Sequence, residues 1–472
     1  MQENEGNILK PNLKNFIHSL RDIGYTFEVA VADIIDNSIT AKATTIEIYS
    51  TVEPKMIFCI LDNGYGMSEE ELIEAMRLGT KNPNDKRDKQ DLGKFGLGLK
   101  TASFSQCKKL TLISKKDSKI HTRQWDLDYI EQKDEWYLRT PNLSQYDNNP
   151  LFDKLKKQEC GTLVLWEEID RYPKDTFSTL LGRLRSHLCL VFHRFLESKF
   201  DKISIILNNY KLIPFNPFNE AHSATHQIAQ EKITISGHSI KITPYILPHH
   251  SKISKEEWER YATDEGYTKS QGFYLYRANR LLIFGTWWGL YKASDASKLV
   301  RIRIDISNDQ DELWGIDVKK SMANPLPELK QDLKRVLENA LKDGFKPFTT
   351  RGRKINDKTT IKFWDIIPKD KDFYFGVNKQ HPLYERLSES LDDECKFLFD
   401  SYIKGLQAYL PISAIQAQLQ HNPHNIKQEM SFSMVEIEEL AHKLKQLGLP
   451  QEEIERLLKT EIFKNRKELI DE

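Results

Sequence analysis

EVAVADIIDNSITAKA, from Glu28 to Ala43, combines a helical apolar pattern with two polar residues placed to act together. Asp33 and Asn37 are four residues apart, so in a helix they lie on one face, while Ile34 and Ile35 add apolar surroundings. A carboxylate one turn from a neutral oxygen ligand suits a base that orients water beside Mg²⁺, which prefers oxygen ligands and retains waters. A core helix with a surface Asp and a polar cap would show the same pattern, so both interpretations stay open.

The composition limits the kind of protein this is. With 472 residues the chain is too long for one hydrophobic core, which indicates roughly two to four domains. Basic and acidic residues both number 69, so the formal net charge is 0 and the overall positive charge typical of a nucleic-acid-binding protein is missing. The five cysteines form no CxxC pair, which disfavours a disulfide framework and a zinc site. No stretch approaches a membrane span or a signal peptide, so we expect a cytoplasmic protein with no membrane partner.

Two β-rich segments follow the opening helix, at 44–50 and 55–67. The second ends in DNGYGM at 62–67, which places the Asp62 carboxylate at a strand end and two glycines directly after it. Glycines allow a flat ligand to approach the backbone closely. Asp62 could accept a hydrogen bond from an exocyclic amine such as that of adenine, although a DNG sequence is also a common tight turn.

A glycine-rich stretch comes next along the chain. After a helix predicted over 68–78, residues 79–92 (GTKNPNDKRDKQDL) are polar and could close over an anion or form a solvated linker. GKFGLGLKTASFSQC, at 93–107, then places three glycines before a helix predicted to start near Leu97. Amide donors at a helix N-terminus bind phosphate, but the spacing matches neither the Rossmann nor the P-loop pattern. A later strand opens with Gly161-Thr162, whose hydroxyl could reach a buried polar group.

The order of these four features resembles the ATP-site motifs of the GHKL, or Bergerat-fold, ATPases. That family includes gyrase B, a heat-shock chaperone, the histidine kinases, MutL and the MORC proteins. The resemblance covers residues 10–170 and implies ATP and Mg²⁺ as ligands, with Asn37 as the magnesium ligand and Asp62 as the carboxylate that reads the adenine amine. It further implies nucleotide contacts from Gly64, Gly66, Met67, Gly79, Thr80, Lys81, Gly93, Gly96, Leu97, Gly98, Leu99, Lys100 and Thr162.

Asp33 departs from the family pattern, because most hydrolysing members have Glu at this position. Asp is one methylene shorter, and a displacement of that size can lower a rate by on the order of 100-fold when the reacting geometry is tight. We therefore predict slow ATP hydrolysis that depends on Asp33 as the catalytic base.

A second domain is predicted at 176–345, after an ATP-binding domain at 1–175. It opens with a long helix over 176–198 and continues with β-rich sequence that includes the hairpin GFYLYRANRLLIF at 272–284. Lys319 and Lys320 lie between a strand and a helix that Pro327 helps to start. This placement resembles the transducer domain of the gyrase B, MutL and MORC groups, where a lysine inserts into the γ-phosphate site. Two surface lysines would look the same.

The region 346–472 is predicted to be mostly helical and to serve interaction or dimerisation. The neighbouring segment 343–363 carries six basic residues against two acidic ones, which makes it the best local patch for DNA. Ser433 and Glu436 predict a capping box at the start of an amphipathic helix, and a second helix follows Pro450. These two helices form either an intramolecular hairpin or a surface for a protein partner.

We therefore predict an α+β fold, with a Bergerat-fold sandwich, a βαβ transducer-like domain and a mostly helical C-terminal region. The resemblance implies a MORC/MutL-like molecular clamp that hydrolyses ATP slowly, forms a homodimer on ATP and acts on DNA or assembles partners, as in bacterial anti-phage or restriction defence. The alternative is a nucleotide-gated interaction or chaperone-like module with negligible hydrolysis and no DNA binding, which the shorter Asp33 and the zero net charge favour. A histidine kinase is disfavoured because His18 is followed by Ser rather than by an acid.

Overall fold

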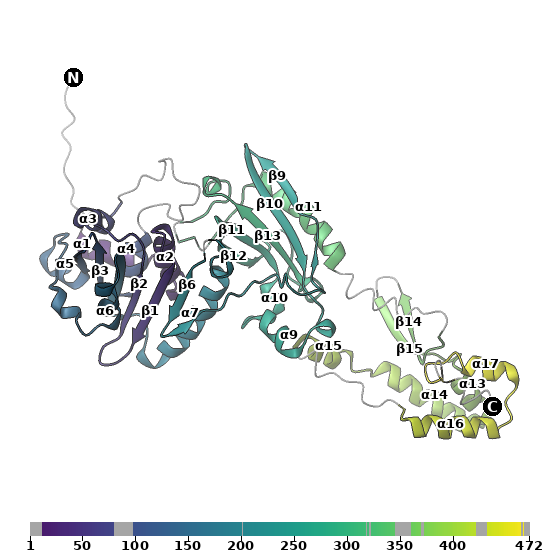
Figure 1. The fold of residues 1–472 in the computed structure, drawn as a ribbon. Coiled ribbons are helices and arrows are strands. Elements are labelled where there is room, and N and C mark those ends of the chain that lie inside the picture. The colour runs from purple at the N-terminus through teal and green to yellow at the C-terminus, as the bar shows by residue number, and fades with distance from the viewer. Residues whose placement is uncertain are drawn as a thin grey trace. The chain divides into compact units, whose positions relative to one another are not determined.

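The computed structural model describes residues 12–79, 98–200, 202–317, 319–320, 322–344, 360–369, 372–421, 432–463 and 466. The chain divides into two compact units (Figure 1). Unit 1 consists of Met1–Pro248 and Glu259–Gly344, and unit 2 of His249–Trp258 and Phe345–Glu472. The predicted ATP-binding and transducer-like regions thus fall almost entirely within unit 1.

The first layer of unit 1 is a mixed sheet whose described strands run in the order β4-β3-β5-β2-β1-β6-β7. Neighbouring strands are antiparallel except for β1 and β6, which are parallel. The strands are β1 (Thr45–Thr51), β2 (Ile57–Asp62), β3 (Lys109–Lys116), β4 (Lys119–Asp126), β5 (Gly161–Glu167), β6 (Ser204–Leu207) and β7 (Tyr210–Lys211). Because β6 pairs with β1, this sheet continues past the predicted domain boundary at residue 175.

Helices cover both faces of this sheet. Alternate side chains of β2 point to opposite faces, so Phe58 and Ile60 join the core that includes α2 and α7, while Cys59 and Leu61 join a smaller core beneath α6. The helices of this region are α1 (Leu13–Arg21), α2 (Phe27–Thr40), α3 (Glu69–Met76), α4 (Gly98–Gln106), α5 (Leu127–Lys133), α6 (Pro150–Lys157), α7 (Phe177–Val191) and α8 (His193–Glu197). The prediction of a single helix over 176–198 is wrong, because the helix is interrupted at the buried Phe192, between α7 and α8.

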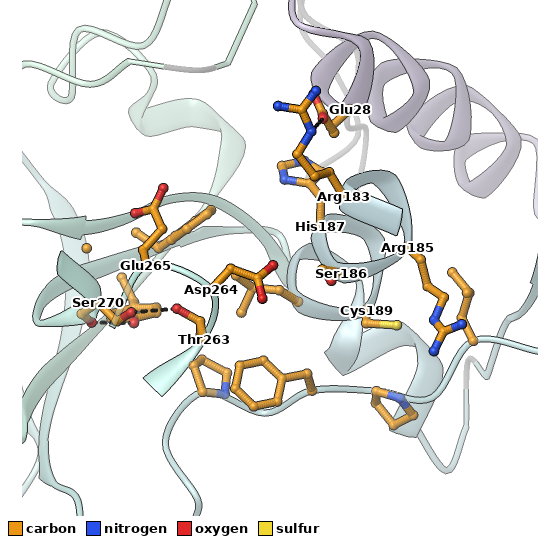
Figure 2. A pocket seen from close by; sticks show the side chains of 18 of the residues that line it. Glu28, Arg183, Arg185, Ser186, His187, Cys189, Thr263, Asp264, Glu265 and Ser270 are labelled. Atoms are coloured by element: carbon orange, nitrogen blue, oxygen red, sulfur yellow. Dashed lines mark hydrogen bonds and ion pairs between the residues drawn. The ribbon is translucent and has the colours of Figure 1, made fainter. Parts of the chain in front are cut away.

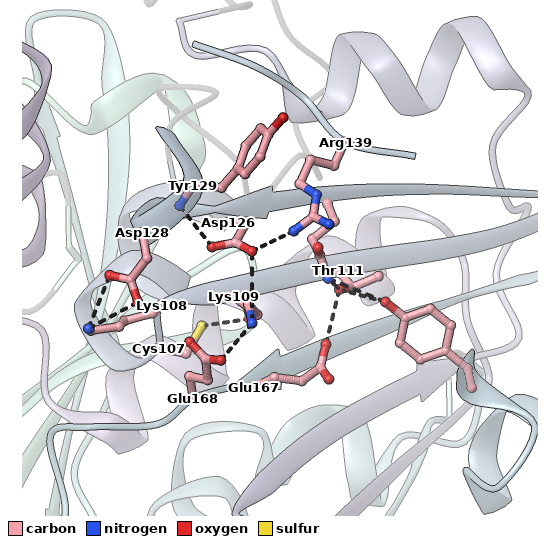
Figure 3. Close-up of polar contacts among 12 residues, drawn as sticks. Cys107, Lys108, Lys109, Thr111, Asp126, Asp128, Tyr129, Arg139, Glu167 and Glu168 are labelled. Carbon is pink, nitrogen blue, oxygen red and sulfur yellow. Dashed lines mark hydrogen bonds and ion pairs between the residues drawn. The ribbon is translucent and has the colours of Figure 1, made fainter. Parts of the chain in front are cut away.

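Polar contacts fix the register of β3, β4 and β5 at one end of the sheet (Figure 3). Lys109 Nζ lies 2.6 Å from a carboxylate oxygen of Glu168 and 3.8 Å from one of Asp126. Asp126 also accepts a hydrogen bond of 2.6 Å from Arg139. These contacts anchor the strands whose opposite ends carry Ser114 and Thr162, two residues of the candidate site.

A second mixed sheet lies in the later part of unit 1, with the described order β12-β11-β13-β10-β8 and with β9 paired to β10. The predicted hairpin at 272–284 is confirmed, since β11 and β12 are antiparallel and Ala278 and Asn279, with φ of 46° and 69°, form the turn. The strands are β8 (His226–Gln227), β9 (Glu231–Ile235), β10 (His238–Ile246), β11 (Gly272–Arg277), β12 (Arg280–Thr286) and β13 (Val300–Ile306). Helices α9 (Lys255–Ala262) and α10 (Tyr267–Ser270) connect β10 to β11, and α11 (Pro327–Gly344) packs against β10 and β13.

Unit 2 contains a β-hairpin and mostly helices. Its elements are β14 (Trp364–Lys369), β15 (Asp372–Val377), α13 (Pro382–Ser390), α14 (Asp393–Ala408), α15 (Ile412–His421), α16 (Met434–Gln446) and α17 (Gln451–Leu457). The capping box of Ser433 and Glu436 at the start of α16 is confirmed. The apolar face of α16 packs against α17 within a small core that includes Ile437 and Leu457, as the intramolecular interpretation predicts. Among the described helices, none combines the length and apolar character that crossing a bilayer requires.

Candidate functional site

Helix α2 carries the two acids at the centre of the site. It starts at Thr26, whose hydroxyl accepts the backbone N–H of Val29 at 3.4 Å. The apolar residues that follow bury most of the helix, so Asp33 and Asp36 are only 4% and 1% exposed, whereas Asn37 is exposed. Both acids therefore need partners within the protein, because an unpaired buried carboxylate is costly.

Asp33 is held by a hydroxyl and by an ammonium. The Tyr25 hydroxyl donates to Asp33 Oδ2 at 3.0 Å, and Lys320 Nζ donates to Asp33 Oδ1 at 3.1 Å. The α4 helix begins next to this carboxylate, since a Cβ added to Gly98 would lie 3.6 Å from Asp33 Oδ2. Burial raises the pKa of Asp33, and the Lys320 charge only partly opposes this shift. The predicted base thus lies where the glycine-rich motif reaches its helix.

Asp36 is held by two cations. Lys320 Nζ donates to Asp36 Oδ2 at 2.8 Å and Arg280 Nε donates to Asp36 Oδ1 at 3.0 Å. Burial disfavours the charged form of Asp36, but the charges of Lys320 and Arg280 outweigh this effect and hold the pKa of Asp36 below its usual value. Arg280 is the first residue of β12 and Lys320 lies in the segment before α11, so the second-sheet region supplies both cations to helix α2.

Asp62, at the end of β2, forms the second polar centre. Asp62 is 5% exposed, and its carboxylate accepts hydrogen bonds from Ser38 Oγ at 2.9 Å, Gly64 N at 2.9 Å and Thr162 N at 3.3 Å. Ser114 Oγ lies 2.9 Å from Thr162 Oγ1 and accepts the Met67 N–H at 2.8 Å. Burial raises the pKa of Asp62, although the hydrogen bonds from Gly64, Ser38 and Thr162 oppose the shift. A carboxylate has about four acceptor positions, so Asp62 can accept one more hydrogen bond.

The glycines after Asp62 are required by the protein's own backbone. A Cβ on Gly64 would lie 2.7 Å from the Ala41 carbonyl oxygen. Gly66 has φ of +66°, and a Cβ there would lie 1.9 Å from the Lys115 carbonyl oxygen. The sequence predicts close approach at these positions, and in the structure other backbone segments make that approach.

The remaining predicted residues are placed as follows. Lys319 Nζ lies 3.4 Å from the Gly24 carbonyl oxygen, so Lys320 and not Lys319 reaches the acids of α2.

Lys100 is buried and donates to the Ala75 carbonyl at 3.0 Å, and Leu99 packs against the main core. Gly79 has φ of +72° and open space around it. Thr80, Lys81, Gly93, Gly96 and Leu97 lie outside the described residues.

The comparison with protein families decides what this arrangement is. Residues 25–162 match the family described as histidine kinase-, DNA gyrase B-, and HSP90-like ATPase. These residues form a GHKL ATPase domain. The match spans α2, Asp62, the glycine-rich stretch at 93–107 and the Gly-Thr start of β5, so all four predicted motifs fall inside it.

The chain is similar to parts of longer proteins. It is 27% identical over 144 residues to ATPase MORC2B of Mus musculus and 25% identical over 144 residues to ATPase MORC2 of Homo sapiens. Each match covers 29% of this chain and 14% of the relative. A putative MutL protein homolog 1 of Schizosaccharomyces pombe is 31% identical over 106 residues, which is 22% of this chain and 15% of that protein. ATP binding and ATPase activity are therefore supported at the level of the family.

Asn37 suits the magnesium role that the GHKL motifs imply. Its side chain is exposed one turn after Asp33 and hydrogen bonds to none of the described residues, so its oxygen is available. Across the described ranges there is no cluster of three or more His, Cys, Asp or Glu side chains that could hold a metal. One amide ligand nevertheless fits Mg²⁺, because this ion is commonly held by one or two protein ligands, substrate phosphates and water.

A groove of about 1280 Å³ lies beside the acid–lysine cluster, which consists of Asp33, Asp36, Arg280 and Lys320. Figure 2 shows the part of the groove that Arg183, His187 and Cys189 line. Arg280, Lys319 and Lys320 line it together with α7, while Asn37, Asp62 and Thr162 do not, so it is distinct from the Asp62 centre. Burial lowers the pKa of His187, which also lines the groove, to about 3.

Several residues of the site are not predicted from the sequence, namely Tyr25, Asp36, Ser38, Ser114 and Arg280. Arg280 alone leaves a usable signal, because it opens an otherwise apolar strand, RLLIF, where a charge must find a partner. The two serines occupy ordinary positions on a helix and a strand. Only the folded chain shows that they point to Asp62 and Thr162.

Proposed function

We propose that this protein is an ATP-driven switch of the MORC/MutL type, in which the GHKL domain binds and slowly hydrolyses ATP and the second-sheet region responds. The observation that carries the proposal is Lys320, which reaches 287 residues back along the chain to Asp33 at 3.1 Å. A lysine from one region that contacts the predicted base of another can couple the chemistry at the nucleotide to the arrangement of both.

In the proposed binding mode, Asp62 and the start of α4 each contact a different part of ATP. Asp62 accepts the adenine amine at its free acceptor position, and the N-terminus of α4 faces the phosphates, where its amides and helix dipole favour negative charge. Asn37 would hold Mg²⁺, whose charge when bound offsets that of the phosphate oxygens. Asp33 accepts the proton of the attacking water, a role that its raised pKa suits because a catalytic base works best with a pKa close to the working pH.

The later steps of the proposal rest on the resemblance to MORC and MutL. We propose that ATP binding forms a homodimer, that the dimer acts on DNA or assembles partners in the cytoplasm, and that anti-phage defence is one such setting. The basic segment 343–363 supports DNA binding by its charge, although residues 345–359 lie outside the described residues. The apolar face of α16 is used within unit 2, so a protein partner would need another surface of the helices there.

The competing proposal is a nucleotide-gated module with negligible hydrolysis. The shorter Asp33 favours it, and so does the pairing of that carboxylate with Lys320, because a base that already neutralises an ammonium is less available to a water. Both proposals include ATP binding, so turnover separates them.

The test is ATP turnover by the full chain and by Asp33→Ala, with Asp153→Ala on α6 as the control. The Asp153 side chain is 52% exposed, so its loss should leave the site intact. We expect slow turnover by wild type and by the control, and a drop of roughly 100-fold or more in Asp33→Ala with ATP still bound. Equal turnover by Asp33→Ala and wild type would refute the base assignment. Bound ATP without any turnover in wild type would favour the competing module.

A further inference from the structure

Asp33 and Asp36 share one lysine but differ in what else holds them. Lys320 Nζ lies 3.1 Å from Asp33 and 2.8 Å from Asp36. Asp36 has a second cation, Arg280, at 3.0 Å. The other partner of Asp33 among the described residues is the neutral hydroxyl of Tyr25 at 3.0 Å.

The four charged groups form a largely buried cluster in which two acids face two bases. The side chains of Asp33, Asp36, Arg280 and Lys320 are 3%, 2%, 6% and 11% exposed. Breaking a buried ion pair by removing one partner is strongly unfavourable because it leaves a charge without compensation. If Lys320 moves away, Asp36 keeps a directly paired cation, whereas the hydrogen-bond donor that Asp33 keeps among the described residues is the neutral Tyr25 hydroxyl.

An anionic ligand that binds beside Asp33 would compete for the same ammonium. Gly98, at the start of α4, lies close enough to Asp33 that an added Cβ would be 3.6 Å from its carboxylate. A terminal phosphate held at this helix start would therefore lie near Lys320. The β-phosphate of a diphosphate lies one phosphate unit farther from that position and competes less.

We propose that Asp36, held in place by Arg280, competes with the terminal phosphate of ATP for Lys320 and thereby sets the preference of the site for ATP over ADP. When the phosphate wins, Lys320 leaves Asp33, and the carboxylate that accepts the proton of water is uncovered. Triphosphate binding thus activates the base, while Asp36 and Arg280 act as positioning residues. This inference rests on the proposed ATP site.

The size of the effect follows from the coupling between the phosphate and the cluster. In wild type, ATP must replace the contact between Lys320 and Asp36, whereas ADP leaves it in place. Asp36→Asn weakens that contact, so ATP binding should tighten and ADP binding should change little. We expect the ratio of the dissociation constants of ADP and ATP to rise by roughly tenfold, within the usual range of coupling between sites.

A second variant is needed beside Asp36→Asn, because Asp36→Asn alone leaves the Arg280 guanidinium buried without its carboxylate. That unpaired charge could destabilise the fold or attract any phosphate. The double variant Asp36→Asn, Arg280→Met removes both charges and keeps the cluster neutral, so a raised ratio there is due to the released Lys320. Glu28→Gln provides the matched control, since Glu28 is an α2 acid paired with Arg183 at 3.6 Å and outside the cluster.

The experiment is calorimetric titration of the full chain and these variants with ADP and with a non-hydrolysable ATP analogue, both with Mg²⁺. A raised ratio in Asp36→Asn and in the double variant, with the wild-type ratio in Glu28→Gln, supports the inference. If wild type binds both nucleotides and the double variant has the wild-type ratio, the inference is overturned and the proposed ATP site stands. If wild type binds neither nucleotide, both proposals are overturned.

Discussion

The Asp62 carboxylate is buried at the end of β2, yet the described residues leave one of its acceptor positions unused. A buried acid with this geometry is suited to recognise a ligand amine. Asp62→Asn keeps the shape and one acceptor oxygen but places an N–H₂ where the second oxygen was. The new side-chain N–H₂ and the adenine amine, both hydrogen-bond donors, would then face each other.

We therefore predict that Asp62→Asn weakens binding of a non-hydrolysable ATP analogue by roughly 100-fold, in line with a lost hydrogen bond to a charged acceptor and an unpaired buried donor. Asp153→Asn, on the surface of α6, is the control and should bind like wild type. Calorimetric titration checks both. Unchanged affinity in Asp62→Asn would show that adenine is read elsewhere.

His187 makes the stability of the fold depend on pH. Burial lowers its pKa from 6.5 in the unfolded chain to about 3, so between these values the unfolded chain binds a proton that the folded chain does not. Stability contributed by the neutral imidazole is thus complete above pH 6.5 and declines as the pH falls toward about 3. Linkage gives a loss of about 2 kcal/mol from this group between pH 7 and pH 5.

The prediction for His187→Leu is a smaller loss of stability on acidification, by about 2 kcal/mol between pH 7 and pH 5. Urea denaturation of both proteins at the two pH values measures the difference. His193, whose pKa is also lowered to about 3 by burial, is present in both proteins and cancels in the comparison. An equal loss in wild type and His187→Leu would contradict the assignment.

At the scale of elements, the sequence predicts α2, β2, α4 and β5 because their apolar and glycine patterns are local. It predicts Asp33, Asn37 and Asp62 because these residues fall at strand ends or at helical spacing. Contacts between distant elements leave no such pattern. Arg280 reaches Asp36 across 244 residues, and the break between α7 and α8 occurs where Phe192 packs 4.6 Å below the Arg280 guanidinium.

The turn after β2 depends on glycine for reasons internal to the fold. Gly66 combines φ of +66° with a Lys115 carbonyl oxygen 1.9 Å from where a Cβ would be. Gly66→Ala must therefore strain the backbone and displace β3, which carries Ser114. We predict a loss of at least about 2 kcal/mol in the free energy of unfolding, measured by urea denaturation.

Gly182→Ala is the matched control for Gly66→Ala. Gly182 lies within α7, and a Cβ there would have nothing within 4 Å. Alanine is the better helix former, so this variant should gain up to about 1 kcal/mol. Equal effects of the two substitutions would mean that the close approach at Gly66 does not constrain the turn.

At the scale of the whole molecule, the sequence predicts which kinds of domain occur, but it does not predict that a strand from the second predicted domain joins the sheet of the first. The pairing of β6 with β1 joins residues 204–207 to 45–48, and this places a strand from beyond residue 175 in the first sheet. Lys320 likewise comes to contact Asp33 and Asp36 only through the fold, since either lysine of the pair fits the sequence pattern. Local patterns thus predict most elements and the Asp62 centre, whereas the acid–lysine cluster requires the structure.

The zero net charge has a consequence for self-association, because two copies approach without strong mutual repulsion. If ATP drives dimerisation, a non-hydrolysable ATP analogue with Mg²⁺ should double the mass of 55.2 kDa seen by analytical ultracentrifugation. Asp62→Asn, which should bind the analogue roughly 100-fold more weakly, should retain the mass of the nucleotide-free protein at an analogue concentration that just saturates wild type. A protein whose mass is the same with and without the analogue, while calorimetry shows the analogue bound, would remove dimerisation from the mechanism. ATP would then act only between the GHKL domain and the region that carries Arg280 and Lys320.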